Sequence, residues 1–216
     1  MAISINLTEL KARGWTVLDS DAQESSLLKI GKVLGTPVPP KPGCTLISRL
    51  TPTPSSKGKK TFSTVFGKGK FPMHTDTAHW PKPARYIILC DAGKLHDRPT
   101  LIVSGNEILN FFDPSDVGNA VWKVSGPSGY FPCSLTFSYD GCMGLRYDPL
   151  CMECLNASAR SISANIKRIP IIPKEISWKF GKVVIFDNWR VLHGRGDSKI
   201  NDVEKRVLLR LMVATN

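Results

Sequence analysis

The stretch FPMHTDTAHWPKPARYIILC, from Phe71 to Cys90, joins a buried-strand pattern to two residues that bind metal ions well. Its last part, 86–89, is an apolar run typical of a buried strand. Upstream, His74 and Asp76 stand one residue apart in a segment with little other charge. Because alternate residues of a strand point to the same face, both side chains can reach one point in space. A surface histidine beside a capping aspartate would give the same pattern, so the pair needs a third ligand.

The other three of the four histidines stand in different contexts. His79 precedes a Trp-Pro pair and His96 lies in the polar segment KLHDRP, which indicates loops for both. His193 follows an apolar strand and a turn in VVIFDNWRVLHGRG, where Gly194 and Gly196 permit close backbone approach. The sequence therefore favours His193, with a hydrogen-bonded core histidine as the alternative. Two histidines and a carboxylate form the facial triad that binds Fe(II) in oxygenases.

The final apolar segment, EKRVLLRLMV, carries two arginines. Arg206 and Arg210 alternate with apolar residues, in phase with Leu208, so they are expected on one face of a strand. Arginine suits bidentate recognition of carboxylates. The spacing indicates that the two arginines lie on an interior face and bind anions. The alternative is that they are ordinary arginines on a solvent-exposed face.

The rest of the chain reads as many short strands with few helices, which favours a β-sandwich or barrel. Helices are expected at 7–13, 21–35, 106–112 and 157–169, and a loop at 36–43. Strands are expected at 15–18, 44–52, 84–90, 98–105, 176–180, 181–188, 189–196 and 205–214, with a hairpin at 134–148 that turns at Asp140-Gly141.

Composition sets further bounds on the 216-residue chain. Its 29 Lys and Arg against 18 Asp and Glu give a net charge of +11, which attracts anions. Much of the excess lies in a cluster at 57–70, either a solvated loop or a lid or docking surface. The start of the chain lacks a signal-peptide pattern and no apolar run is long enough to span a membrane. A cytoplasmic protein with six reduced cysteines is expected, and the C-x-x-C at Cys151 and Cys154 lacks a second ligand pair.

Taken together, these motifs resemble those of a known enzyme family. The motifs HTD with its PKP turn, RPTL, FDNWRVLHGR and the arginine-bearing last strand are similar to the taurine dioxygenase and clavaminate synthase branch of the Fe(II)/2-oxoglutarate-dependent oxygenases. The resemblance covers most of the chain from about Phe71 to Val213 and is weaker before it. It implies a mainly β (α+β) fold: a double-stranded β-helix, or jelly roll, with flanking helices. Residues 1–216 would form one domain, in which 1–70 pack on the core.

The resemblance also implies a set of roles. His74, Asp76 and His193 would bind iron. Thr100 and Arg206 would bind a carboxylate of the cosubstrate 2-oxoglutarate, and Arg210 an anionic group of the substrate; a shifted register would exchange the two arginines. With O2, the enzyme would oxidise an unactivated C–H bond and release succinate and CO2.

The aspartate argues for hydroxylation, desaturation, epimerisation or cyclisation, because halogenases of the superfamily lack this carboxylate. The substrate would be a small amino-acid-like or anionic molecule, of the kind met in secondary metabolism. Arg146 and Asp148, in GLRYDPLCM, are candidates for its carboxylate and amine, although they could equally form a structural ion pair. Trp80 is a candidate pocket wall or a core residue.

Three alternatives stay open. The basic face could dock an acidic carrier protein that bears the substrate. The net charge could serve a nucleic-acid-modifying oxygenase, although the lysine cluster has few interleaved aromatic residues. A non-enzymatic jelly-roll binding protein could carry the triad by chance. The short chain suggests a reduced lid over the substrate, or one supplied by residues 55–70; the oligomeric state is open.

Overall fold

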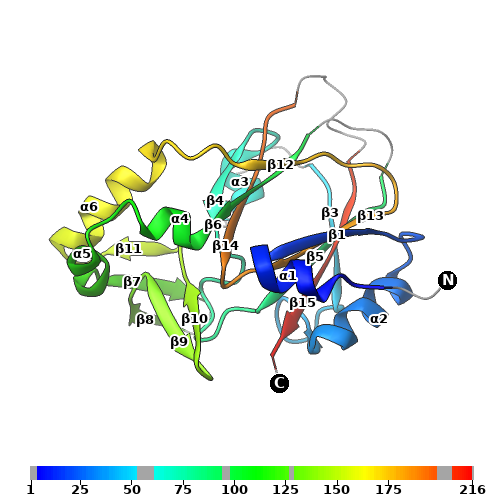
Figure 1. Ribbon diagram of the computed structural model, residues 1–216, viewed down its shortest axis with the longest axis horizontal. Helices are drawn as coiled ribbons and strands as arrows, with labels where there is room; N and C mark the ends of the chain where they lie inside the picture. The colour runs from blue at the N-terminus through cyan, green and yellow to red at the C-terminus, as the bar shows by residue number, and fades with distance from the viewer. Residues whose placement is uncertain (1–3, 53–60, 94–97, 127–128, 199–205, 216) are drawn as a thin grey trace.

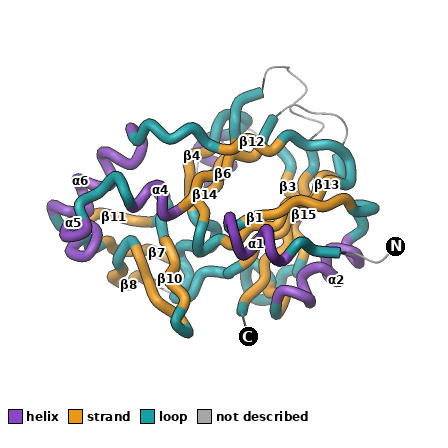
Figure 2. The backbone as a smooth tube through the Cα atoms, viewed as in Figure 1, coloured by secondary structure: helices purple, strands orange, loops and turns teal. Residues whose placement is uncertain are grey.

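The structure is a computed structural model that describes residues 4–52, 61–93, 98–126, 129–198 and 206–215. Antiparallel strands make up most of its secondary structure, which confirms the mainly β class. Figure 1 shows two groups of elements at opposite ends of the molecule and strands β4, β6 and β14 between them. In Figure 2 the strands fill the interior and the helices lie toward the outside.

The largest sheet has six strands, and the segment from Phe71 to Cys90 supplies most of one of its central strands, β5. β5 lies between β13 and β15, and all contacts in the sheet are antiparallel. Its strands are β1 (Trp15–Asp19), β13 (Lys182–Asp187), β5 (Tyr86–Asp91), β15 (Leu208–Ala214), β2 (Thr36–Val38) and β3 (Ile47–Leu50).

A four-stranded sheet faces it across an apolar core. Its strands, in spatial order, are β12 (Lys174–Ile176), β6 (Thr100–Ser104), β14 (Val191–Arg195) and β4 (Phe71–His74). Alternate residues of β5 separate two cores: Ile87 and Leu89 pack between the sheets, while Ile88 and Cys90 face outward. On β15, Leu208 and Met212 share the inner face that the period-2 pattern predicts for Arg210.

Two helices, α1 (Leu7–Arg13) and α2 (Glu24–Leu34), cover the outer face of the six-stranded sheet. Leu27 and Ile30 of α2 are buried against that face. Gly31 permits the close approach, because a β-carbon there would lie 2.6 Å from Leu211 Cδ2. The helices predicted at 7–13 and 21–35 are confirmed, the second with a shorter span.

The other end of the molecule holds a third core, around the fully buried Trp122. The predicted hairpin is confirmed, with Asp140-Gly141 in the turn between its strands. The elements here are β9 (Thr136–Tyr139), β10 (Cys142–Leu145), the sheet β11 (Met152–Cys154), β7 (Trp122–Gly126) and β8 (Gly129–Cys133), and helices α4 (Gly105–Leu109), α5 (Pro114–Asn119), α6 (Ala157–Asn165) and the 3-10 turn Ile166–Arg168.

Two local expectations were wrong. The segment 36–43, expected as loop, begins with β2, because Pro37 sits on an edge strand where a missing backbone N–H does no harm. The strand expected at 176–180 ends at Ile176, and the residues after it are irregular. No helix among the described residues is both long and apolar enough to cross a bilayer.

Candidate functional site

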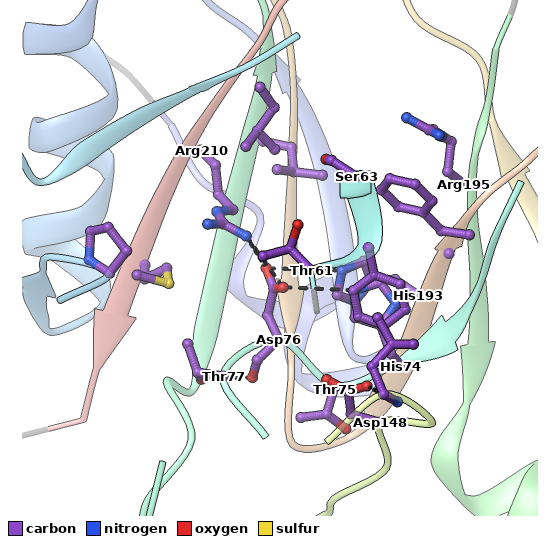
Figure 3. A pocket seen from close by; sticks show the side chains of 18 of the residues that line it. Thr61, Ser63, His74, Thr75, Asp76, Thr77, Asp148, His193, Arg195 and Arg210 are labelled. Carbon is purple, nitrogen blue, oxygen red and sulfur yellow. Dashed lines mark hydrogen bonds and ion pairs between the residues drawn. The ribbon is translucent and has the colours of Figure 1, made fainter. Parts of the chain in front are cut away.

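A cavity of about 720 Å³ opens between the two facing sheets. Seven sequence-predicted site residues line it: His74, Thr100, Asp76, Asp148, His193, Arg206 and Arg210. They come from segments far apart in the chain, and Figure 3 shows several of them pointing toward Asp76. The fold therefore brings together what the sequence could only suggest by spacing.

The three candidate metal ligands cluster on one side of this cavity. His74 ends β4 and stands directly opposite His193 of β14 in the strand register. Gly194 is needed for this pairing, because a β-carbon there would lie 2.8 Å from the Phe71 carbonyl oxygen. Asp76 lies just beyond the end of β4 rather than on the strand, in a turn where Thr77 has a φ of 57°.

Ligand atoms of the three residues all lie within 4.8 Å of one another. Asp76 is 3.7 Å from His74 Nε2 through Oδ1 and 4.0 Å from His193 Nε2 through Oδ2. Ligand atoms held about 2 Å from one ion are separated by about 3 to 4 Å. These two separations therefore fit a shared metal ion.

The protonation states of the ligands suit a cation. His74 Nδ1 lies 2.9 Å from the Pro72 carbonyl oxygen, which can only accept, so this contact favours the tautomer that carries its proton on Nδ1 and a lone pair on Nε2. Burial, aided by the neighbouring His74, lowers the pKa of His193 to about 3, which leaves its imidazole neutral. Burial alone would raise the pKa of Asp76, but Arg210 and the two imidazoles hold it well below its usual value.

Arg210 is the nearest cation to the triad. Its Nη1 donates to Oδ2 of Asp76 at 3.1 Å and approaches Oδ1 at 3.3 Å. Figure 3 shows Arg210 and the two histidines on opposite sides of the Asp76 carboxylate. Arg210 Nε is buried without a hydrogen-bond partner among the described residues. The guanidinium thus keeps donor capacity for an anion in the cavity.

Asn188 fixes the Asp76 backbone, a role that the sequence analysis missed. Its side-chain oxygen accepts from the Asp76 N–H at 2.9 Å, and its amide donates to the carbonyls of Asp76 and Ala84 at 2.9 and 2.8 Å. The side chain is fully buried. The only sequence signal was an amide residue directly after a buried strand, in FDNW.

A second group of cations lies farther along the cavity. Arg206 is 7% exposed, and its Nε is buried with no partner among the described residues. Burial and the neighbouring Arg98 lower the pKa of Arg206 to about 10, so it stays charged at neutral pH. Thr100 Oγ1 accepts from Trp178 Nε1 at 3.2 Å, which leaves the hydroxyl proton free to donate. Both residues therefore have unused donors in a buried, positively charged place.

Helix α3 (Phe62–Phe66) lies over the triad and falls within the segment 55–70 that was considered as a lid. Residues 55–60 of that segment lie outside the described residues. The Phe62 ring stacks on His74, with centroids 4.0 Å apart. Arg195 holds the end of the helix, because its Nε donates to the Gly69 carbonyl at 2.8 Å and its Nη2 to that of Gly67 at 2.5 Å. The helix closes one side of the cavity.

The opposite side is built from loops. Asp148 lines the cavity, accepts from the Leu150 N–H at 2.7 Å and is 8% exposed. His79 and Cys151 line it as well, although the sequence analysis set His79 aside as a loop residue and considered Cys151 only as part of a C-x-x-C. Burial raises the pKa of the Cys151 thiol well above its usual value, and Asp148 adds to the shift.

Two predicted substrate contacts do not line this cavity. Arg146 is not among the residues that line the cavity: its Nη1 donates to the Ala78 and Trp80 carbonyls and its Nη2 to that of Pro81, each at 2.7 Å. The guanidinium clamps the 78–81 loop, and no ion pair with Asp148 is found among the described residues. Trp80 packs partly against the core between the sheets and lines a different cavity.

No family model matches the sequence, and no curated protein does. The structure, however, matches solved structures of oxygenases over nearly its whole length. An asparagine oxygenase in complex with Fe(II), 3-hydroxyasparagine and succinate has a TM-score of 0.73 at 18% identity, covering 97% of this chain and 78% of that one. OrfP, a non-heme iron oxygenase in complex with Fe, succinate and (3S)-hydroxy-L-Arg, has a TM-score of 0.73 at 17% identity, covering 97% and 79%.

PvcB, an Fe, alpha-ketoglutarate dependent oxygenase from an isonitrile synthetic pathway, has a TM-score of 0.68 at 17% identity, covering 96% of this chain and 78% of that one. OrfP has also been solved with Fe and alpha-ketoglutaric acid, which is 2-oxoglutarate. The chain has the fold of these iron and 2-oxoglutarate oxygenases. The resemblance inferred from its motifs is confirmed at the level of the fold.

Proposed function

We propose that this protein is an Fe(II)- and 2-oxoglutarate-dependent oxygenase that oxidises a C–H bond of a small amino-acid-like substrate. The observation that carries the proposal is the cluster of His74, Asp76 and His193, whose ligand atoms lie within 4.8 Å of one another on the cavity wall. Two imidazoles and one carboxylate are the donor set of non-heme Fe(II) oxygenases. The fold supports the same reading, because the solved structures it matches include iron-bound oxygenases.

The residues divide the work as follows in this proposal. His74, Asp76 and His193 would hold the iron. Arg206 and Thr100 bind the distal carboxylate of 2-oxoglutarate with donors that are otherwise unused. Phe62 and the facing sheets exclude water from the triad. Bound iron supplies the activation of O2, and the reaction as a whole converts substrate C–H, 2-oxoglutarate and O2 into C–OH, succinate and CO2.

An amino-acid-like substrate is supported by two opposite charges in one cavity. Arg210 has donors free for a carboxylate, and Asp148 can accept from an amine. Solved structures with the same fold hold hydroxylated asparagine and hydroxylated arginine. We therefore place the substrate between Arg210 and Asp148, with hydroxylation as its outcome.

We further propose that the two facing sheets form a double-stranded β-helix, or jelly roll, and that residues 1–216 act as one oxygenase domain. Packing of α1 and α2 on the six-stranded sheet supports the second point. A carrier-bound substrate and a cytoplasmic location stay predictions from the sequence. Nothing in the comparisons favours a nucleic-acid substrate or a non-enzymatic binding role.

The test is the visible spectrum of the protein with Fe(II) and 2-oxoglutarate in the absence of O2. The proposal expects a weak charge-transfer band, and Asp76→Ala should abolish it by lowering iron affinity more than about 100-fold. Asp140→Ala, in the exposed hairpin turn, is the matched control and should leave the band intact. Absence of a band with folded wild-type protein would overturn the proposal.

A further inference from the structure

A second cavity, of about 490 Å³, adjoins the first. Pro40, His79 and Gly126 line both cavities, so the two meet at these residues. Most of the other residues that line the second cavity are prolines and aromatic residues: Pro39, Pro42, Pro81, Trp80, Tyr130 and Phe131. This position, directly beside the proposed substrate site, makes it a candidate extension of that site.

The two cavities differ in chemistry. The first carries the charged side chains of the triad and of Arg206, Arg210 and Asp148. The second has Lys41 as its one residue of fixed charge among the described residues, and its aromatic and proline rings suit an apolar group. Tyr130 remains 75% exposed there, which is unusual for a large aromatic side chain beside a cavity.

The passage between the two cavities depends on a glycine, Gly126, which has no side chain to narrow it. Gly126 ends β7, and a β-carbon at this position would lie 3.0 Å from the His79 carbonyl oxygen. Any larger residue would press on the backbone of the loop that carries His79. Burial lowers the pKa of His79 although Asp148 opposes it, so the imidazole at the passage is neutral near pH 7.

Backbone contacts place the acidic end of the substrate site near this passage. Ser125, next to Gly126, donates its N–H to the Cys151 carbonyl at 3.0 Å, and Asp148 lies in the same loop and lines the first cavity together with His79. The nitrogen of a bound amino acid would face Asp148, while its carboxylate would face Arg210. A substituent on that nitrogen is then the part of the substrate that reaches the second cavity. A free amino acid leaves this apolar space filled with water.

We infer, resting on the proposed function, that the substrate is an N-acylated amino acid, a short peptide being one form, with its apolar acyl part in the second cavity. Its amide N–H donates to Asp148 and its carboxylate binds Arg210. The acyl group passes His79 and Gly126 and packs against Tyr130 and Phe131.

The experiment compares L-amino acids with their N-phenylacetyl derivatives. Each is titrated into the protein loaded with Fe(II) and 2-oxoglutarate without O2, and binding is read from the shift of the charge-transfer band. Burial of a phenyl ring should make the capped forms of the best amino acids bind at least about tenfold more tightly than the free forms. Admitting O2 should then release succinate faster with the capped forms.

Two variants locate the effect. Tyr130→Ala should remove most of the preference for capped forms, and Gly126→Ala should do the same by narrowing the passage. Phe180→Ala, a control at an aromatic residue that is 66% exposed and lines neither cavity, should leave the preference unchanged. The inference is overturned if free amino acids bind as tightly as capped ones, or if Tyr130→Ala has no more effect than Phe180→Ala. If no band forms with Fe(II) and 2-oxoglutarate, the proposed function itself fails and the inference fails with it.

Discussion

The cavity between the facing sheets has two sides that are held in different ways. Strands, or residues next to strand ends, carry the first side, which we call the strand wall: His74, Thr100, His193, Arg206 and Arg210. Loops carry the second, which we call the loop wall: His79, Asp148 and Cys151. Backbone pairing fixes much of the strand wall, with His74 and His193 as direct partners between β4 and β14.

Side-chain contacts to backbone hold much of the loop wall. Thr75 Oγ1 donates to the Leu145 carbonyl at 3.2 Å and accepts from the Tyr147 N–H at 3.1 Å, which ties one loop to the turn that carries Asp76. Arg146 holds the other loop through three carbonyls. In the proposed function, this difference gives a rigid side that holds the metal, the cosubstrate and the substrate carboxylate, and an adjustable side that selects the rest of the substrate.

The first prediction separates the roles of Arg206 and Arg210 on the strand wall, and it has the largest expected effect. Arg206→Gln should weaken 2-oxoglutarate binding by about 3 kcal/mol, because it removes a buried charge that pairs with a carboxylate. Arg210→Gln should instead raise the KM for the amino-acid substrate and leave 2-oxoglutarate affinity within a few-fold of wild type. Anaerobic titration of the charge-transfer band with 2-oxoglutarate measures the first effect, and succinate release at varied substrate concentration measures the second.

The outcome decides between the two arginines, which the sequence left interchangeable. If Arg210→Gln has the larger effect on 2-oxoglutarate, their roles are reversed. Arg206→Lys is a useful companion, because it keeps the charge but loses the planar fork. It should recover part of the affinity.

The second prediction tests the loop wall. Arg146→Met keeps the length of the side chain but leaves the Ala78, Trp80 and Pro81 carbonyls without their donor, so it should lower the free energy of unfolding by about 2 kcal/mol. Arg160→Met, at an exposed position of α6, is the control and should have little effect. Chemical denaturation measures both.

Arg146→Met should also separate the functions of the two walls. Folded Arg146→Met protein should bind iron and 2-oxoglutarate as wild type does, while its KM for substrate rises because His79 is no longer held in place. A loss of iron binding in this variant would show that the two walls are not independent.

The difference between strands and loops also explains which parts of the site could be predicted from the sequence. A period of two predicted that Arg210 shares a face with Leu208, and in the structure Leu208 and Met212 lie on the inner face of β15. The H-x-D spacing predicted that His74 and Asp76 lie close together, and they do, although Asp76 lies beyond the strand. Regular elements impose a repeat on the side chains, and a repeat can be recognised in a single sequence.

The loop wall has no such repeat. His79 reaches the cavity because Arg146, more than sixty residues later, holds the 78–81 loop, with the bond to Pro81 spanning 65 positions. Asn188 positions Asp76 across 112 residues. Arg146 was expected at the substrate because of its charge, but the local pattern does not say which way a loop side chain points. Long-range contacts of this kind depend on the folded chain and leave little trace in the local sequence.

The third prediction, with the smallest effect, returns to the strand wall. Thr100→Val replaces the hydroxyl by a methyl group of similar shape and leaves the buried Trp178 N–H without its acceptor, at a cost of about 1 kcal/mol in unfolding free energy. If the hydroxyl also donates to 2-oxoglutarate, the variant should need several-fold more of it to saturate the charge-transfer band. Thr100→Ser keeps the hydroxyl and should restore the 2-oxoglutarate affinity even if it packs less well. Equal weakening by valine and serine would mean that packing on β6, rather than the hydroxyl, sets the affinity, and Thr100 would then leave the set of cosubstrate ligands.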